Sequence, residues 1–149
     1  MARFLDHLDV RLVGHKRWMT LATLRYESDV AKRTIVVPAE FITDFASVPR
    51  VPFAYLIAGA RAPGPSTIHD YWYQNPDIED RPLGDSVFFE AAGVNQPELG
   101  FYAESDVIRG LMWSGIRAGG WWPWMRHGKR AATLNPIWTA SAWPEVQTP

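Results

Sequence analysis

The chain has 149 residues, a length that suits one compact domain with its own hydrophobic core. Its 15 lysines and arginines balance 16 aspartates and glutamates, so the formal charge of -1 favours no nucleic-acid partner. Cysteine is absent, which excludes disulfides, thiolate zinc sites and a cysteine nucleophile. Asp6, His7 and Asp9 interrupt the start of the chain where a signal peptide would be apolar, so we expect folding in the cytoplasm.

Residues 1–45 are predicted to be mostly strands. Apolar and polar residues alternate over much of this region, and valine and isoleucine are frequent near its end, a pattern typical of short antiparallel strands. The predicted strands are residues 8–13, 18–26 and 34–42, with turns at 14–16 and 27–29. We therefore expect a small N-terminal antiparallel sheet.

Residues 52–120 are predicted to be mainly helical, with loops that carry motifs. Pro49 and Pro52 cannot continue a central strand, because proline lacks the backbone donor and restricts the residue before it. The predicted helices are a short one at 53–58, one capped by Ser66 or Thr67 and ending near Asn75, one from Pro82 to Gly93, and one from Asp106 to Gly119. The expected fold class is α+β, a small sheet followed by two or three main helices, in one domain over residues 1–149.

Residues 121–149 contain five tryptophans and four prolines without helical or strand periodicity, which predicts an extended tail. Large aromatic side chains in such a segment need a surface to cover them. We expect this tail to dock on the helices of its own chain. A partner-binding arm is the alternative.

The densest polar cluster in the helical region consists of His69, Asp70 and Tyr73. Helical spacing places His69 and Tyr73 on one face, and Asp85 on the next helix can reach the imidazole if the two helices pack together. A carboxylate that orients a histidine is a standard way to make a general base for water. Asp70 could then bind a hard cation, such as calcium, with carbonyls of the loop at 59–64. The alternative is structural: a satisfied histidine, a salt-bridging aspartate and a core tyrosine.

The string TDFASVPR, residues 43–50, is the second unusual feature. Asp44, Ser47 and Arg50 follow the end of a strand, where polar side chains commonly line the rim of a binding pocket. We expect them to line the same cavity as His69. The alternative is that Asp44 and Ser47 saturate backbone donors in a tight turn.

Four strings, VPAEFITDFASVPR, TIHDYWY, RPLGDSVFFEAA and DVIRGLMWSGIRAGG, resemble in order and spacing a family of uncharacterised phage and prophage proteins. That family has the pattern VPxGFxTDFASVPR, HDxLY and R-x-x-AD-x-x-F, followed by a closing helix. This chain departs from it at Glu40, where the family has glycine, at Gly84, where it has alanine, and in the tryptophan-rich tail. The resemblance implies a phage setting and no particular reaction.

A weaker similarity suggests a reaction. His-Asp-x-x-Tyr on one helix, followed by an aspartate on a neighbouring helix, is similar to the catalytic core of secretory phospholipases and of the lipase domain in some small viral capsid proteins. The similarity implies that His69 activates water, Asp70 holds calcium, Asp85 orients His69 and Tyr73 supports the network. The disulfides and the glycine-rich calcium loop of those enzymes have no counterpart in this sequence.

Three functions are compatible with these features. The first is a hydrolase of phospholipid, or of another cell-envelope ester or amide, used in phage entry or lysis. The second is a tail or baseplate component whose tryptophan-rich tail binds other virion proteins. The third, ranked last, is a metal-dependent peptidoglycan peptidase that uses His69 and Asp70. The protein is expected in the host cytoplasm, with incorporation in the virion left open.

Overall fold

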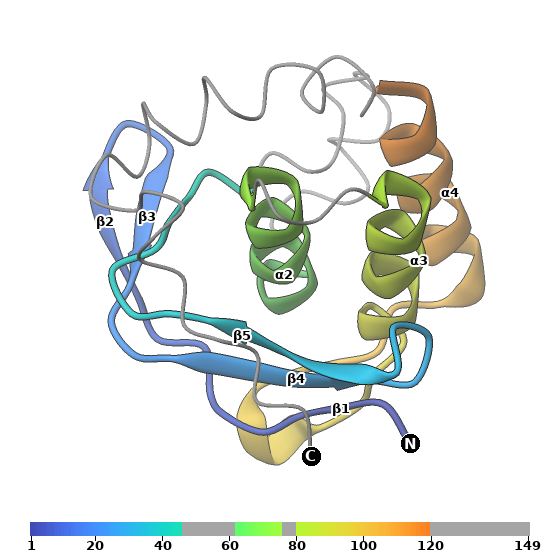
Figure 1. Ribbon diagram of the computed structural model, residues 1–149, viewed down its shortest axis with the longest axis horizontal. Helices are drawn as coiled ribbons and strands as arrows, with labels where there is room; N and C mark the ends of the chain where they lie inside the picture. Colours follow the sequence, from blue (N-terminus) through green and yellow to red (C-terminus); the bar gives the residue numbers. More distant parts are fainter. Residues whose placement is uncertain (46–61, 76–79, 120–149) are drawn as a thin grey trace.

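The computed structural model describes residues 1–45, 62–75 and 80–119 (Figure 1). It confirms the predicted α+β class, because two antiparallel sheets of three strands each precede the main helices. One sheet has the order β1 (Arg3–Phe4), β4 (Leu24–Ser28) and β5 (Arg33–Val37). The other has the order β2 (Val10–Gly14), β3 (Arg17–Thr20) and β6 (Ile42–Thr43). The helices are α2 (Pro63–Gln74), α3 (Arg81–Ala91) and α4 (Asp106–Gly119), with a 3-10 turn, η1 (Pro97–Leu99), before α4.

The prediction of one strand over 18–26 was wrong, because this stretch forms β3 and β4, which belong to different sheets. The chain leaves the first of these sheets at Thr20, which is buried. The Thr20 hydroxyl donates to Pro38 O at 2.8 Å and accepts from Phe41 N at 2.9 Å. These bonds hold the chain at a corner between the sheets. The turn predicted at 27–29 also begins later, because β4 continues through Ser28, whose side chain is buried.

Helix α2 begins earlier than predicted. Its N-cap is Ala62, and Pro63 and Pro65 occupy its first turn, where a missing backbone donor costs nothing. Thr67, predicted as a cap, lies inside the helix and donates to Pro63 O at 2.8 Å. The predicted helix at 53–58 and the tail at 121–149 lie outside the described residues.

Helices α2 and α3 lie side by side over one face of the β1–β4–β5 sheet, and α4 packs on α3 (Figure 1). The main core between sheet and helices is aromatic and aliphatic, and its largest fully buried side chains include Phe4, Tyr26, Phe41, Ile68 and Trp72. A smaller cluster joins α3 to α4 through Phe88, Ala92, Met112 and Ile116. Together these contacts fix α3 against both of its neighbours.

The backbone conformation at position 40 and the close packing at position 84 both limit which residues fit. Glu40 has φ +65°, a left-handed conformation that favours glycine. At Gly84 the backbone of α3 packs directly against the side chain of Trp72, because a Cβ there would lie 2.5 Å from Trp72 Cδ1. The indole of Trp72 therefore fills the space that a larger residue at position 84 would need.

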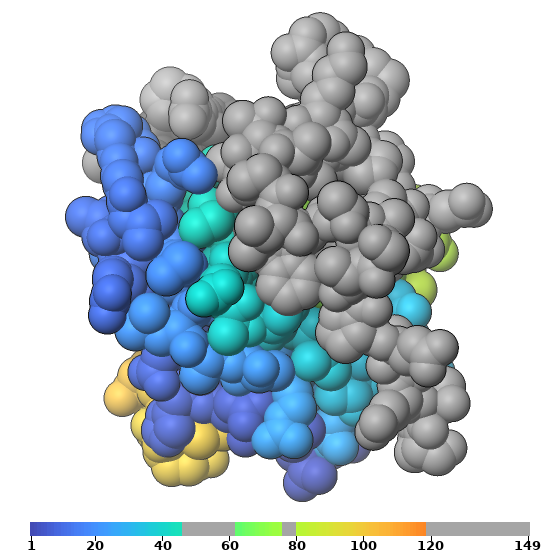
Figure 2. Space-filling view, turned by 60° about the vertical axis from the view of Figure 1, so that its left-hand side comes forward, coloured from blue at the N-terminus to red at the C-terminus, as the bar shows by residue number. Residues whose placement is uncertain are grey.

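The β2–β3 hairpin stands at one side of the molecule (Figure 1), and its blue atoms lie along one edge of the face in Figure 2. It connects to the rest of the fold through β6, where Trp18 pairs with Thr43 and Met19 with Ile42. Within the described ranges, no helix combines the length and the apolar character needed to cross a membrane.

Candidate active site

Helices α2 and α3 bring His69 and Asp85 into direct contact. His69 Nε2 lies 3.0 Å from Asp85 Oδ1, and both side chains are buried, with exposed fractions of 3% and 0%. The hydrogen bond between adjacent helices that the spacing predicts is therefore present. A buried imidazole and a buried carboxylate each need such a partner, because an unpaired polar group in a protein interior is costly.

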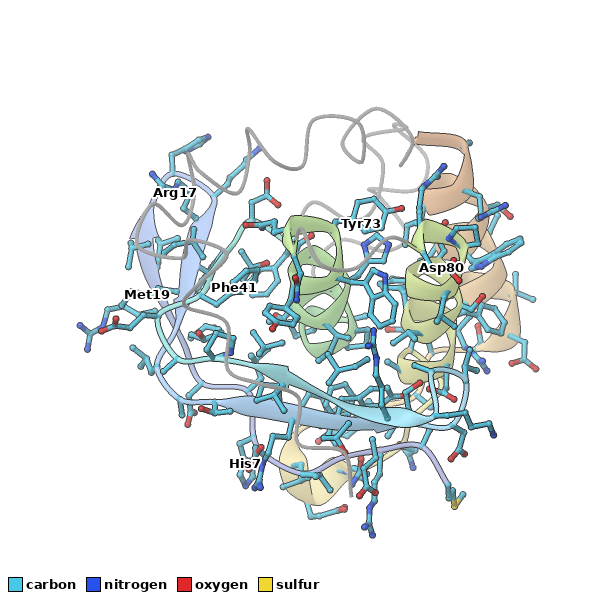
Figure 3. All side chains as sticks on the ribbon, in the orientation of Figure 1. His7, Arg17, Met19, Phe41, Tyr73 and Asp80 are labelled. Atoms are coloured by element: carbon cyan, nitrogen blue, oxygen red, sulfur yellow. The ribbon has the colours of Figure 1, made fainter. Side chains whose placement is uncertain are left out.

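Tyr73 binds the same carboxylate oxygen. Its hydroxyl donates to Asp85 Oδ1 at 2.6 Å, and its ring centroid lies 4.1 Å from that of His69, one helical turn earlier. Figure 3 shows Tyr73 between α2 and α3. Burial, together with the hydrogen bond to Asp85, raises the pKa of Tyr73 well above its usual value. The phenol therefore stays protonated and acts as a donor to Asp85.

Two arginines complete the surroundings of Asp85. Arg117, on α4, donates to Asp85 Oδ2 at 3.3 Å, and Arg81 has a guanidinium nitrogen 3.8 Å from the same oxygen. Arg81 also donates to the Tyr73 hydroxyl at 2.9 Å and to the carbonyl oxygens of Ile116 and Arg117 at 3.2 and 2.9 Å. One side chain thus joins the end of α4 to the network between α2 and α3.

The partners of Asp85 decide its charge. Burial raises the pKa of Asp85, but the hydrogen bonds from His69 and Tyr73, with the charges of His69 and Arg81, outweigh burial and hold that pKa below its usual value. Asp85 is therefore a carboxylate at neutral pH, which can accept hydrogen bonds and cannot donate them.

This charge also decides the tautomer of His69. Because the Asp85 carboxylate only accepts, Nε2 of His69 carries a proton, and the tautomer of a neutral ring in this position has its lone pair on Nδ1. Within the described part of the chain, Nδ1 makes no hydrogen bond. The arrangement is that of an oriented imidazole with a free basic nitrogen.

Asp70 faces a different element from its neighbour His69. Its buried carboxylate accepts a hydrogen bond from Thr43 on β6. Searched over the described residues, the chain contains no group of three His, Cys, Asp or Glu side chains that could hold a metal. Most of the loop at 59–64, expected to supply carbonyls, lies outside those residues. The calcium site predicted around Asp70 therefore stays a prediction.

The predicted binding residues are only partly described. Asp44 directly follows Thr43, whose hydroxyl contacts Asp70 and accepts from Phe45 N at 3.2 Å. The start of the TDFASVPR string therefore lies against α2, near the candidate site. Ser47 and Arg50 lie outside the described residues, so the shared cavity remains a prediction.

A family model described as "Protein of unknown function (DUF1353)" matches residues 18–115. The chain belongs to this family. The matched region contains His69, Tyr73 and Asp85, and it ends just before Arg117. A search of curated proteins found no match, and neither did a search of solved structures.

Sequence reasoning did not assign site roles to Arg81, Arg117 or Thr43. A signal existed for Arg81, which lies four residues before Asp85 on the same helix and so can reach its carboxylate. Arg117 lies in the last turn of α4, where the macrodipole favours a cation, so its position on its own helix already accounts for a basic residue there. No local pattern links it, or Thr43, to a residue of another element.

Proposed function

We propose that this protein hydrolyses an ester or amide bond, with His69 as the general base that activates water. The contact between His69 Nε2 and the ionised Asp85 carboxylate carries this proposal, because it leaves the basic lone pair on Nδ1. Tyr73 donates to the same oxygen and supports this orientation of the pair. The buried surroundings strengthen these polar contacts, since little water competes for them.

The reaction follows general acid–base logic. His69 Nδ1 takes a proton from water while the water oxygen bonds to the carbonyl carbon of the substrate. The imidazolium that forms is stabilised by the Asp85 carboxylate. It then returns the proton to the leaving oxygen or nitrogen as the bond to the carbonyl carbon breaks. The histidine ends in its starting state, and one water molecule is consumed.

We infer that a phospholipid ester is the substrate class. The support is the similarity of His69, Asp70, Tyr73 and Asp85 to the phospholipase core described above, together with the observed contacts of His69 and Tyr73 with Asp85. The resemblance of the sequence strings to phage and prophage proteins supports a role at the cell envelope during entry or lysis. These inferences go beyond the family assignment, which names no activity.

The test is release of fatty acid from vesicles of phosphatidylethanolamine and phosphatidylglycerol by the full chain, with calcium and with a chelator. We expect release by the wild-type protein and a loss of about 10²–10⁴-fold in H69Q, the usual contribution of a general base. The matched control is H7Q, because His7 is exposed and lies on the other side of the sheet from the helices (Figure 3).

Two outcomes would overturn the proposal. One is a wild-type protein that releases no fatty acid and cleaves no other ester or amide of the cell envelope. The other is an H69Q variant that is folded by circular dichroism and as active as H7Q. Activity that a chelator abolishes and calcium restores would support the role of Asp70 that the phospholipase similarity implies.

A further inference from the structure

The β2–β3 hairpin concentrates basic side chains that have no acidic partner among the described residues. All seven residues from Arg11 to Arg17 are exposed, and three of them, Arg11, Lys16 and Arg17, are basic. No carboxylate in the described ranges lies within ion-pair distance of any of the three. The chain as a whole is nearly neutral, so this hairpin is a local basic surface.

The other described arginines differ from those of the hairpin, because each has a partner. Arg33 stacks over the ring of Trp72, with 4.8 Å between its guanidinium carbon and the ring centroid. The ion-paired arginines are Arg3 with Glu27, Arg25 with Asp6, Arg81 and Arg117 with Asp85, and Arg109 with Asp106. Within the described residues, the hairpin therefore differs from the rest of the chain, because its three cations have no ion-pair partner whereas the arginines elsewhere have partners.

The same hairpin exposes aliphatic side chains. Leu12 and Val13 are 57% and 44% exposed, and they lie beside the cations rather than in a core. Figure 3 shows Arg17 at the outer end of the hairpin. Cations mixed with exposed aliphatic residues are typical of a surface that rests on anionic lipid, where the charges attract headgroups and the apolar groups enter the interface.

We propose that the β2–β3 hairpin docks the protein on an anionic lipid surface. A second copy of the chain is disfavoured as the occupant, because β2 is an edge strand and pairing two copies would bring their cations together. Nucleic acid is disfavoured because the aliphatic groups would contribute nothing to phosphate contacts. Trp18, the one aromatic of β2 and β3, packs against Phe45 rather than presenting a stacking surface.

This inference does not depend on the hydrolase proposal, since it follows from exposure and charge alone. The two features are nevertheless connected in the fold. Trp18 of the hairpin pairs with Thr43, and Thr43 contacts Asp70, the neighbour of His69. A hairpin seated on lipid would therefore hold the candidate active site near the same surface.

The test is co-sedimentation of the full chain with vesicles of phosphatidylcholine alone and of phosphatidylcholine with 30% phosphatidylglycerol, a lipid ratio chosen for the assay as roughly that of a strongly anionic surface. We expect binding to the anionic vesicles only, weakening as salt rises. The triple variant R11Q/K16Q/R17Q should lose about 100-fold in partitioning, at about fivefold per cation. L12S/V13S keeps the charges and should also bind more weakly, by about tenfold.

A charge-matched control separates the hairpin from net charge. R3Q/R25Q/K32Q removes the same three charges from the β1–β4–β5 sheet and its β4–β5 turn, and it should bind like the wild-type protein. Wild-type protein that binds neutral and anionic vesicles equally, or binds neither, would overturn the proposal. So would a control variant that loses as much binding to anionic vesicles as the hairpin triple variant does. A third contrary result is an L12S/V13S variant that binds lipid like the wild-type protein and binds duplex DNA as tightly as lipid. On a water-soluble ester the hairpin variants should keep any activity, so failure here is distinguishable from failure of the hydrolase proposal.

Discussion

Helix α3 carries two acidic side chains, Asp85 and Glu90, that receive several hydrogen bonds but from different kinds of donor. Glu90 faces the sheet, where its Oε2 accepts from the hydroxyls of Tyr26 at 2.9 Å and Ser28 at 2.7 Å, and its Oε1 accepts from Val30 N at 2.9 Å. Asp85 faces α2 and α4, where its donors are an imidazole, a phenol and arginine.

The difference separates a contact that holds the fold from one that could also perform chemistry. Burial, followed by the charge of Glu90, raises the pKa of Tyr26 well above its usual value. The donors to Glu90 therefore keep their protons at neutral pH, and Glu90 ties α3 to β4. Asp85 has a tyrosine in the same role, but it also contacts His69, whose imidazole has one nitrogen that can donate a proton and one that can accept a proton.

The largest effect expected from this difference is on catalysis. In D85N the amide can donate to His69, which allows the ring to reverse its tautomer and removes the lone pair from Nδ1, so kcat on phospholipid should fall about 10²–10⁴-fold. E90Q should keep wild-type kcat in its folded fraction. Nitrogen NMR of the imidazole gives a readout independent of activity: Nε2 protonated in wild type and E90Q, and altered in D85N. Equal kcat in the two variants would remove the distinction.

The converse effect is on stability. E90A leaves the hydroxyls of Tyr26 and Ser28 without their acceptor in the interior, so the free energy of unfolding should fall by about 3 kcal/mol. Urea denaturation followed by circular dichroism measures this loss. E98A is the control, because Glu98 is exposed and should change stability by less than about 0.5 kcal/mol. A loss in E90A no larger than in E98A would show that Glu90 is not a structural tie.

The packing beside Asp85 offers a third test. G84A places a methyl group against Trp72 and should cost about 1–3 kcal/mol of stability. W72L removes the indole that a Cβ at position 84 would meet, so W72L/G84A should be more stable than the sum of the two single changes predicts. Denaturation of all four proteins gives the coupling energy. If the stability losses of the two single variants simply add up in the double variant, the methyl group added at position 84 is accommodated by a shift of α3 away from α2, without contact with the Trp72 indole.

The smallest effect is on the acid limb of stability. The folded-state pKa of Asp85 lies below its usual value of about 3.9, so its carboxylate contributes stability above about pH 4 that is lost as pH falls through the folded pKa. The hydrogen bonds from His69 and Tyr73 and the charges of His69 and Arg81 lower this pKa, and Arg117 also faces the carboxylate. The free energy of unfolding should therefore fall more steeply below pH 4 in wild type than in D85N. Parallel curves from thermal melts would contradict the ionised state assigned to Asp85.

Local patterns in the sequence determined much of this protein. Alternation predicted the short strands, helical spacing placed His69 and Tyr73 on one face of α2, and the need of a buried histidine for a partner predicted its contact with Asp85. These features depend on residues within one element or on adjacent helices joined by a short connection. Periodicity encodes contacts of that range, because it describes which side of an element is apolar.

Contacts between distant elements were decided only by the tertiary structure. The side chain of Thr20 turns the chain between two sheets, although the alternation of residues 18–26 continues across that point. Arg117 reaches Asp85 because α4 packs on α3, and Asp70 meets Thr43 because β6 lies against α2. The separation of the hairpin cations from the described carboxylates likewise follows from where those carboxylates lie once the chain has folded. A residue's own sequence neighbours carry no record of such partners, because packing of whole elements brings them together.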